Sequence, residues 1–119
     1  MPRKWLITVT EFPPLQERAY QCRVTQMGRG PDGGSIKVTM MNLDPEHEGR
    51  EHVLVLSATK VHTAGRTAAF FAACGIVVAV GAKIDPEEAT GKVILVRFTA
   101  TANGAFEPTA FEPCQEKPQ

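Results

Sequence analysis

Residues 63–75 (TAGRTAAFFAACG) constrain the fold more than any other stretch, because they are the one convincing helical segment among strand-like runs. Thr63 is predicted to cap the helix N-terminus through its hydroxyl, and Gly75 to end the helix in a left-handed conformation. The apolar stripe of this helix comprises Ala69, Phe70, Ala73 and Cys74, with Phe71 at its border. Because no polar face opposes the stripe, we expect the helix to lie on a core as a plug.

Five strands are predicted around this helix, three before it and two after it. They are residues 20–27, 36–43, 53–56, 93–100 and 105–111. Alternation in the first two strands predicts an inward set of Tyr20, Cys22, Val24, Ile36, Val38 and Met40, and an outward set of Gln21, Arg23, Thr25, Lys37, Thr39 and Met41. The third strand is apolar on both faces, so we expect it to be central in the sheet or covered.

The segments between the strands carry turn signals. Residues 28–34 form a glycine-rich turn, and residues 44–51 form a polar, acidic one. Asp85 followed by Pro86 predicts a one-turn helix, and the Asn103-Gly104 pair predicts a tight hairpin between the last two strands. Before the first strand, adjacent prolines exclude regular structure, and we expect Phe12 and Leu15 to pack against the core.

Three strands, a helix and two further strands follow the order of the OB-fold, a five-stranded barrel with its helix between the third and fourth strands. We therefore expect an all-β chain with one helix and an OB-fold-like barrel. An SH3-like barrel lacks so apolar a helix at that point, whereas an α+β sandwich stays open as an alternative. The predicted domain spans residues 18–113, preceded by an arm or short strand (1–17, with alternation over 5–9) and followed by a flexible tail (114–119).

Composition excludes several classes of protein. The 119 residues carry 13 basic and 13 acidic side chains, and a net charge of zero argues against charge-driven binding to duplex DNA. Three cysteines without metal-type spacing indicate idle thiols in a reducing compartment. No apolar run approaches the roughly 18 residues of a membrane helix, and the first ten residues lack the features of a secretory signal. We therefore expect a cytoplasmic protein.

Five stretches resemble a family of small phage and prophage OB-fold proteins. They are EFPPLQERAYQCRV (11–24), SIKVTMMNL (35–43), AAFFAACGI (68–76), IDPEEATGKVILVRF (84–98) and NGAFEPTAFEP (103–113). Members of this family look like single-stranded-DNA-binding proteins of phage recombination and replication modules, so the resemblance implies that function and such partners. The sequence departs from the family at Arg18 or Ala19, where glycine is usual, and in the acidic turn 44–51.

A single-stranded nucleic acid is held by a cationic groove along its backbone and by flat side chains on which bases stack. In OB-folds this groove crosses the second and third strands and is bordered by loops. The residues predicted to line it are Arg23, Arg29, Lys37, Met41, Arg97 and Phe106. Each has a structural alternative, because charged residues also occupy the solvent face of half-buried strands and aromatic residues also fill cores.

No catalytic or cofactor motif is present. His47, His52 and His62 have no carboxylate or thiol at ligand spacing, so we expect no metal site. The glycine turn lacks the lysine that ends a phosphate loop. Asp85, Glu87 and Glu88 are explained by a helix start. We therefore predict a protein without enzymatic activity or cofactor.

Two other functions stay open at this point. One is a protein-interaction or structural module without nucleic-acid binding, since the same barrel serves many functions. The other is a domain of a sugar- or nucleotide-binding enzyme, which a pocket with strongly perturbed ionisable groups would support. Strand edges and the outward Met41 and Leu43 also favour a homo-oligomer.

Overall fold

The computed structural model of the chain describes residue 6 and residues 11–59 and 61–114. Its elements, in chain order, are β1 (Ala19–Arg29), β2 (Ser35–Asn42), β3 (Glu51–Ser57), α1 (Arg66–Ala73), the short 3-10 helix η1 (Pro86–Ala89), β4 (Val93–Ala100) and β5 (Phe106–Pro113). The strands form one sheet in the order β3-β2-β1-β4-β5, and all neighbours are antiparallel. The prediction of a mostly β chain with a helix between its third and fourth strands is confirmed.

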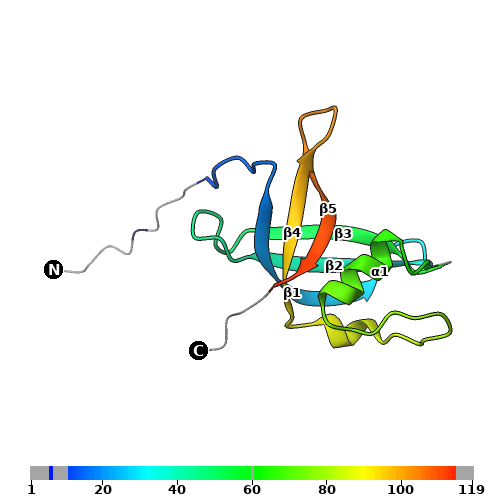
Figure 1. Cartoon of the computed structure of the whole chain (residues 1–119). Coiled ribbons are helices and arrows are strands. Elements are labelled where there is room, and N and C mark those ends of the chain that lie inside the picture. The colour runs from blue at the N-terminus through cyan, green and yellow to red at the C-terminus, as the bar shows by residue number, and fades with distance from the viewer. Residues whose placement is uncertain (1–5, 7–10, 60, 115–119) are drawn as a thin grey trace.

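The sheet is not closed into a barrel, which corrects the expectation of closure. β3 and β5 are its two edge strands and do not pair with each other. Instead, α1 connects them, as Figure 1 shows. The Thr67 hydroxyl donates a hydrogen bond to the Ser57 carbonyl of β3 (2.7 Å), and the Arg66 guanidinium donates one to the Pro108 carbonyl of β5 (2.7 Å). One helix thus takes the place of a β3–β5 strand pairing.

β1 is the longest strand, and it pairs with two neighbours. Its first half pairs with β4 and most of its length pairs with β2. The register with β2 shifts between Val24 and Gln26, so Thr25 is an extra residue of a β-bulge. The bulge also shifts the side-chain alternation: Tyr20, Cys22 and Val24 are buried, and the next buried residue of β1 is Met27.

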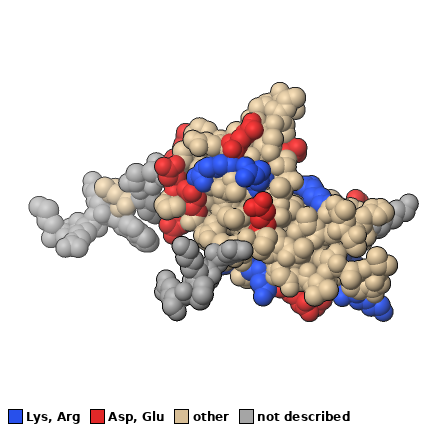
Figure 2. All heavy atoms as spheres, viewed as in Figure 1, with Lys and Arg blue, Asp and Glu red and all other residues tan. Residues whose placement is uncertain are grey.

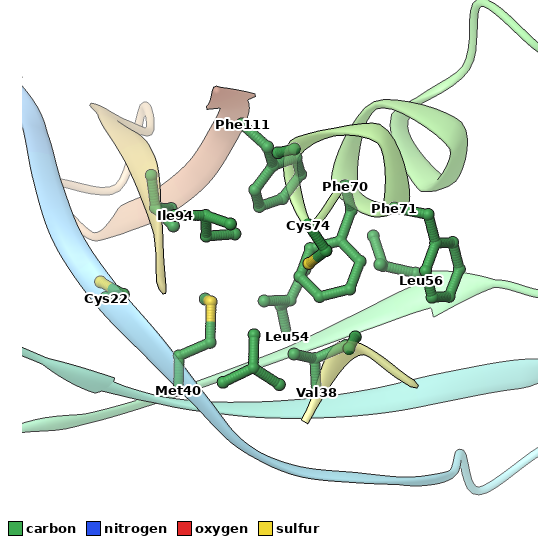
Figure 3. Packing of buried hydrophobic residues seen from close by; sticks show 14 of the residues in the cluster. Cys22, Val38, Met40, Leu54, Leu56, Phe70, Phe71, Cys74, Ile94 and Phe111 are labelled. Atoms are coloured by element: carbon green, nitrogen blue, oxygen red, sulfur yellow. The ribbon is translucent and has the colours of Figure 1, made fainter. Parts of the chain in front are cut away.

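The core lies between the concave side of the sheet and α1, and Figure 3 shows the side chains that meet there. Phe70 of α1 packs edge-on against Phe111 of β5, with ring centroids 5.4 Å apart and planes at 85°. Val38, Leu56 and Ile94 are fully buried from three different strands. Burying one large apolar side chain, such as Phe70 or Ile94, stabilises a fold by about 1.5–3 kcal/mol. The inward set predicted for the first two strands is confirmed.

The helix begins later than predicted. Gly65, not Thr63, is its N-cap, and no side chain caps it. The reason is a turn just before the helix, closed by a hydrogen bond from the Gly65 amide to the His62 carbonyl (2.9 Å). Gly75 has a φ of 82°, so the predicted left-handed end is confirmed. The predicted stripe is right for Phe70, Ala73 and Cys74 but wrong for Ala69, which is exposed.

The third strand corrects another expectation. β3 lies at the edge of the sheet, and its Val53 and Val55 side chains are 54% and 47% exposed. Continuous apolar residues had predicted a central or covered strand. The pattern failed because the second apolar face of β3 meets no other part of the described chain.

The connecting segments agree with most predictions. Asp85 caps η1 by accepting a hydrogen bond from the Glu87 amide (3.0 Å). The β4–β5 hairpin turn contains the predicted Asn103-Gly104 pair but is longer, closed by a bond from the Thr101 amide to the Ala105 carbonyl (2.7 Å).

The chain that leads into β1 meets its prediction only in part. Leu15 is buried, but Phe12 is 48% exposed, beside the guanidinium of Arg50. Of the arm or short strand predicted over residues 5–9, only Leu6 is among the described residues, and it is 81% exposed. Residues 115–119 of the predicted flexible tail are outside the described part of the chain.

Candidate nucleic-acid interface

The strand register defines an outer face, the side of the sheet that points away from the core. Residues directly opposite each other on neighbouring strands share a face. Arg23 of β1 lies between Met41 of β2 and Val93 of β4. Lys37 of β2 lies between Gly28 of β1 and Val55 of β3.

Three of the four predicted cations of the site are therefore on the outer face: Arg23, Lys37 and Arg97, which lies opposite Ala19. All three are exposed. Arg23 and Lys37 do not face each other directly. Lys37 lies opposite Gly28, which is five positions after Arg23 along β1. At about 3.3 Å per residue this is roughly 16 Å along the sheet, enough for each cation to meet a different part of an extended ligand.

On this face, basic and acidic side chains lie on different strands. The three central strands, β1, β2 and β4, contain no aspartate or glutamate at all. The acidic residues of the sheet are on the two edge strands: Glu51 on β3 and Glu107 and Glu112 on β5. The outer face is therefore a cationic central band between two acidic edges, although the whole chain carries no net charge.

The cations of the band have no acidic partner among the described residues. The one ion pair that those residues form joins Arg18 to Asp44 (2.8 Å). An exposed cation without a carboxylate partner keeps its charge available to a phosphate. The band is thus an electrostatic surface and not part of an ion-pair network.

The remaining predicted site residues are in different places. Met41 is half-buried on the outer face beside Arg23. Arg29 is exposed at the end of β1 but lies opposite Ile36, whose side chain is buried, so its position is on the concave side. Phe106 lies opposite Ala100 and packs against the core. The structure therefore brings Met41 together with the band and separates Arg29 and Phe106 from it.

No aromatic side chain among the described residues lies on the outer face. Tyr20, Phe98 and Phe111 are buried on the core side, and Phe12 is beside Arg50. Trp5 is outside the described residues. Apart from its charged residues, the outer face offers aliphatic and polar side chains, chiefly Met41, Val53, Val55, Val93, Leu95 and the threonines of β1, β2 and β4.

The opposite view of the molecule has a different charge pattern. Figure 2, seen as in Figure 1 with α1 toward the viewer, shows Lys and Arg in small separate groups, several of them beside Asp or Glu. Uncharged atoms make up most of this face. No continuous basic stripe crosses it.

A buried polar corner at the β2–β3 turn is the arrangement that sequence reasoning missed. Asn42 and His47 are 0% and 1% exposed. The Asn42 carboxamide accepts a hydrogen bond from the Asp44 amide (2.9 Å) and lies 3.1 Å from Nε2 of His52. The His47 ring packs edge-on against Tyr20, with centroids 5.2 Å apart. The signal in the sequence was the pair His47 and His52, which lie in and just after this turn. On the sequence alone, these histidines were considered only as metal ligands.

The environment of this corner keeps His52 neutral. Burial, together with the positive charge of Arg50 and the neighbouring His47, lowers the pKa of His52 to about 4. Since the Asn42 Oδ1 atom already accepts from Asp44, its Nδ2 donates to His52, and a proton on that ring nitrogen would oppose the donor. Beside it, the Arg18 guanidinium holds the pKa of the Asp44 carboxyl below its usual value.

Two buried cysteines are the other described groups with large pKa shifts. Burial raises the pKa of the Cys22 thiol to about 12 and that of Cys74 to about 11, so neither forms a thiolate readily near neutral pH. Within the described ranges, no group of three or more His, Cys, Asp or Glu side chains is placed to hold a metal ion.

A cavity of about 590 Å³ lies beside α1, away from the outer face. The side chains that line it are mostly apolar and include Ile36, Val61, Phe71, Val78, Val80 and Ile84. Its polar side chains are His62, Thr63 and Thr67, and the Thr67 hydroxyl already donates to Ser57. This leaves His62 and Thr63 as the other polar side chains that line the cavity.

Comparison with known proteins adds no assignment, since neither a protein-family model nor a curated protein matches the chain. With eight residues, α1 is far shorter than a membrane crossing needs, and no other helix in the part of the chain that the structure describes could cross one.

Proposed function

We propose that this chain is a non-catalytic OB-fold-like module that binds single-stranded DNA on the outer face of its central strands. The observation that carries the proposal is the acid-free central band, in which Arg23, Lys37 and Arg97 are exposed and have no acidic partner among the described residues. Strand order and helix position support it, because they resemble those of the OB-fold. The ligand groove of that fold crosses the second and third strands, whereas the band lies on β1, β2 and β4 and shares only β2 with the groove.

The mode of binding follows from the side chains of the band. Lys and Arg would contact phosphates and release counterions, while Met41 and Val93 beside Arg23 would contact sugars or bases through aliphatic atoms. Without an aromatic side chain among the described residues of this face, stacking contributes less than in a typical single-strand binder. We therefore expect modest affinity, little base preference and strong salt dependence.

The biological setting is part of the same proposal. The resemblance of the sequence to phage and prophage OB-fold proteins supports a place in a replication or recombination module. Such a protein would act in the cytoplasm, on single strands exposed during those processes, beside other proteins of the module.

Fluorescence anisotropy with a labelled thymidine oligomer tests the function. If three cations each neutralise one phosphate, the slope of log K against log salt is about −2, and affinity falls about 20-fold between 50 and 200 mM salt. The triple variant Arg23→Glu, Lys37→Glu, Arg97→Glu is expected to lose binding at low salt. Each single Arg or Lys→Gln change should reduce the slope by about 0.7.

Lys83→Glu is the matched control, because Lys83 is exposed in the loop before η1 and lies outside the strands that form the band. It makes the same charge change as Lys37→Glu and should leave the slope unchanged. No anisotropy change with the wild-type protein at low salt, or equal losses in Lys83→Glu and Lys37→Glu, would contradict the proposal.

A protein-interaction module is the second candidate, and one observation favours it. The exposed Val53 and Val55 at the sheet edge offer an apolar contact that nucleic acid does not need. A wild-type protein that fails to bind the oligomer but associates through this edge would support the second candidate over the first.

A further inference from the structure

The outer edge of β3 has backbone groups that no strand among the described residues pairs with. In an antiparallel ladder, alternate residues direct their N–H and C=O groups to the same neighbour. Asn42 donates to Arg50 and Ala58 donates to Gly34, so the even-numbered residues of β3 bond to β2. The N–H and C=O groups of Glu51, Val53 and Val55 therefore point to the open edge.

Between Glu51 and Val55, before the point where α1 bonds to Ser57, this edge lacks the features that usually prevent strand pairing. β3 contains no proline, lysine or arginine, and its register with β2 has no bulge. Natural edge strands are commonly protected by such features. In addition, Val53 and Val55 hold their apolar side chains exposed on the outer face beside the free backbone groups. The edge thus offers hydrogen bonds and apolar surface together to another extended strand.

We propose that the occupant of this edge is β3 of a second copy of the chain, paired antiparallel about a two-fold axis at Leu54. The pattern of free backbone groups fits this symmetry. Val53 would form a hydrogen-bonded pair with the second copy's Val55, and Val55 would form the same pair with the second copy's Val53. Each such pair also joins two β-branched side chains, a favourable cross-strand combination.

The charges of the outer face agree with the same register. Glu51 would lie opposite the second copy's Ser57, whose carbonyl already accepts a hydrogen bond from Thr67. The new backbone hydrogen bonds are therefore those of Val53 and Val55, and no like charges meet at the edge. In the second copy, Lys37 lies beside Val55 on the neighbouring strand. The Cα atom of that Lys37 would then be about 12 Å from the Cα atom of Glu51 in the first copy, close enough for the lysine and glutamate side chains to meet. The acidic edge of one copy would then meet the cationic band of the other.

The proposal rests on the β3 edge alone and not on nucleic-acid binding, so the two can fail separately. Light scattering coupled to size exclusion over a concentration series should show a mass that rises to twice that of the monomer. Val55→Pro removes a donor that points to the open edge and leaves the β2 ladder intact. Val53→Lys brings two like charges together across the axis. Both variants are expected to stay monomeric at every concentration.

Gln26→Lys is the matched control, since Gln26 is exposed on the central strand β1 and the change adds the same charge away from the edge. It should dimerise like the wild type. Circular dichroism and thermal unfolding identify any variant that fails to dimerise because it is unfolded.

Cysteine cross-linking tests the register, in a Cys114→Ser background that removes the half-exposed native thiol. Val53→Cys and Val55→Cys proteins should form a disulfide dimer when mixed and much less when each is oxidised alone. A monomeric wild type at all concentrations overturns the proposal. If the β3 amides of that monomer are nevertheless protected from hydrogen exchange, the edge belongs to another occupant, such as residues 1–10 of the same chain.

Discussion

Two regions of this molecule reverse the usual distribution of polar and apolar side chains. In the corner at the β2–β3 turn, Asn42 and His47 are buried. In the loop between α1 and η1, Val77 and Val80 are 78% and 94% exposed. The difference shows that the partners available to a side chain, and not its polarity alone, decide its position.

Each polar group in the corner has a partner. Asn42 bonds to Asp44 and His52, and His47 lies within 3.4 Å of the Arg50 guanidinium. No buried side-chain nitrogen or oxygen in the described residues lacks a hydrogen-bond partner. Burying a polar group costs little when its hydrogen bonds are made, so the corner is compatible with a stable core.

The loop follows a different logic. Its Val78 and Ile84 pack against the core, whereas Val77 and Val80 face outward from the same short segment. A connecting segment without helix or strand cannot turn every side chain inward. Isolated exposed apolar residues are common on protein surfaces and cost little stability.

The comparison between the buried corner and the exposed loop can be tested by mutation. We expect the largest change in the free energy of unfolding from Asn42→Ala. The change removes both hydrogen bonds of a fully buried side chain and leaves the Asp44 amide and His52 without their partner. We expect the free energy of unfolding to fall by about 2–3 kcal/mol, as measured by urea denaturation. A loss below about 0.5 kcal/mol would mean that water or a neighbour replaces the lost bonds.

A smaller effect is expected from acid. Because the pKa of His52 is lowered to about 4 in the folded state, the unfolded chain binds the extra proton between pH 6.5 and 4. Stability should therefore fall as the pH drops through this window, by about 2 kcal/mol once solvent screening at the half-buried ring is counted. His52→Gln keeps an acceptor for Asn42 and removes the titration, so denaturation midpoints measured against pH should be flatter in this variant. Equal slopes in both proteins would refute the assignment to His52.

The smallest effect is expected in the loop. Val77→Ser and Val80→Ser should each change the free energy of unfolding by less than about 0.5 kcal/mol, because both side chains are already in solvent. Val78→Ser is the comparison within the same segment, since that side chain packs on the core and its loss should cost more. If Val80→Ser destabilises the protein as much as Val78→Ser, the loop is covered in solution.

Much of the fold could be predicted from local patterns. Alternation identified the inward residues of β1 and β2, and Gly75 marked the end of the helix. These predictions depend on near neighbours in the chain. The start of the helix was wrong, because a turn at Gly65 competes with capping by Thr63.

The candidate site was predictable only in part. Arg23 and Lys37 were assigned to the correct side of the sheet from alternation. Phe106 was not, since its face depends on the register of β5 with β4, which shifts between Arg97 and Phe98. The buried corner was also missed, because it forms only when Tyr20, Asn42 and Phe98 from three strands are brought together.

The sequence by itself determined which residues alternate, where the single helix falls and which strands carry no acid, since these depend on spacing and side-chain chemistry along the chain. Tertiary structure decided that the sheet stays open, that β3 becomes an edge and that polar groups fill one corner. Those outcomes depend on which distant segments meet. The bonds from α1 to Ser57 and Pro108, which connect the two edge strands, are the clearest case.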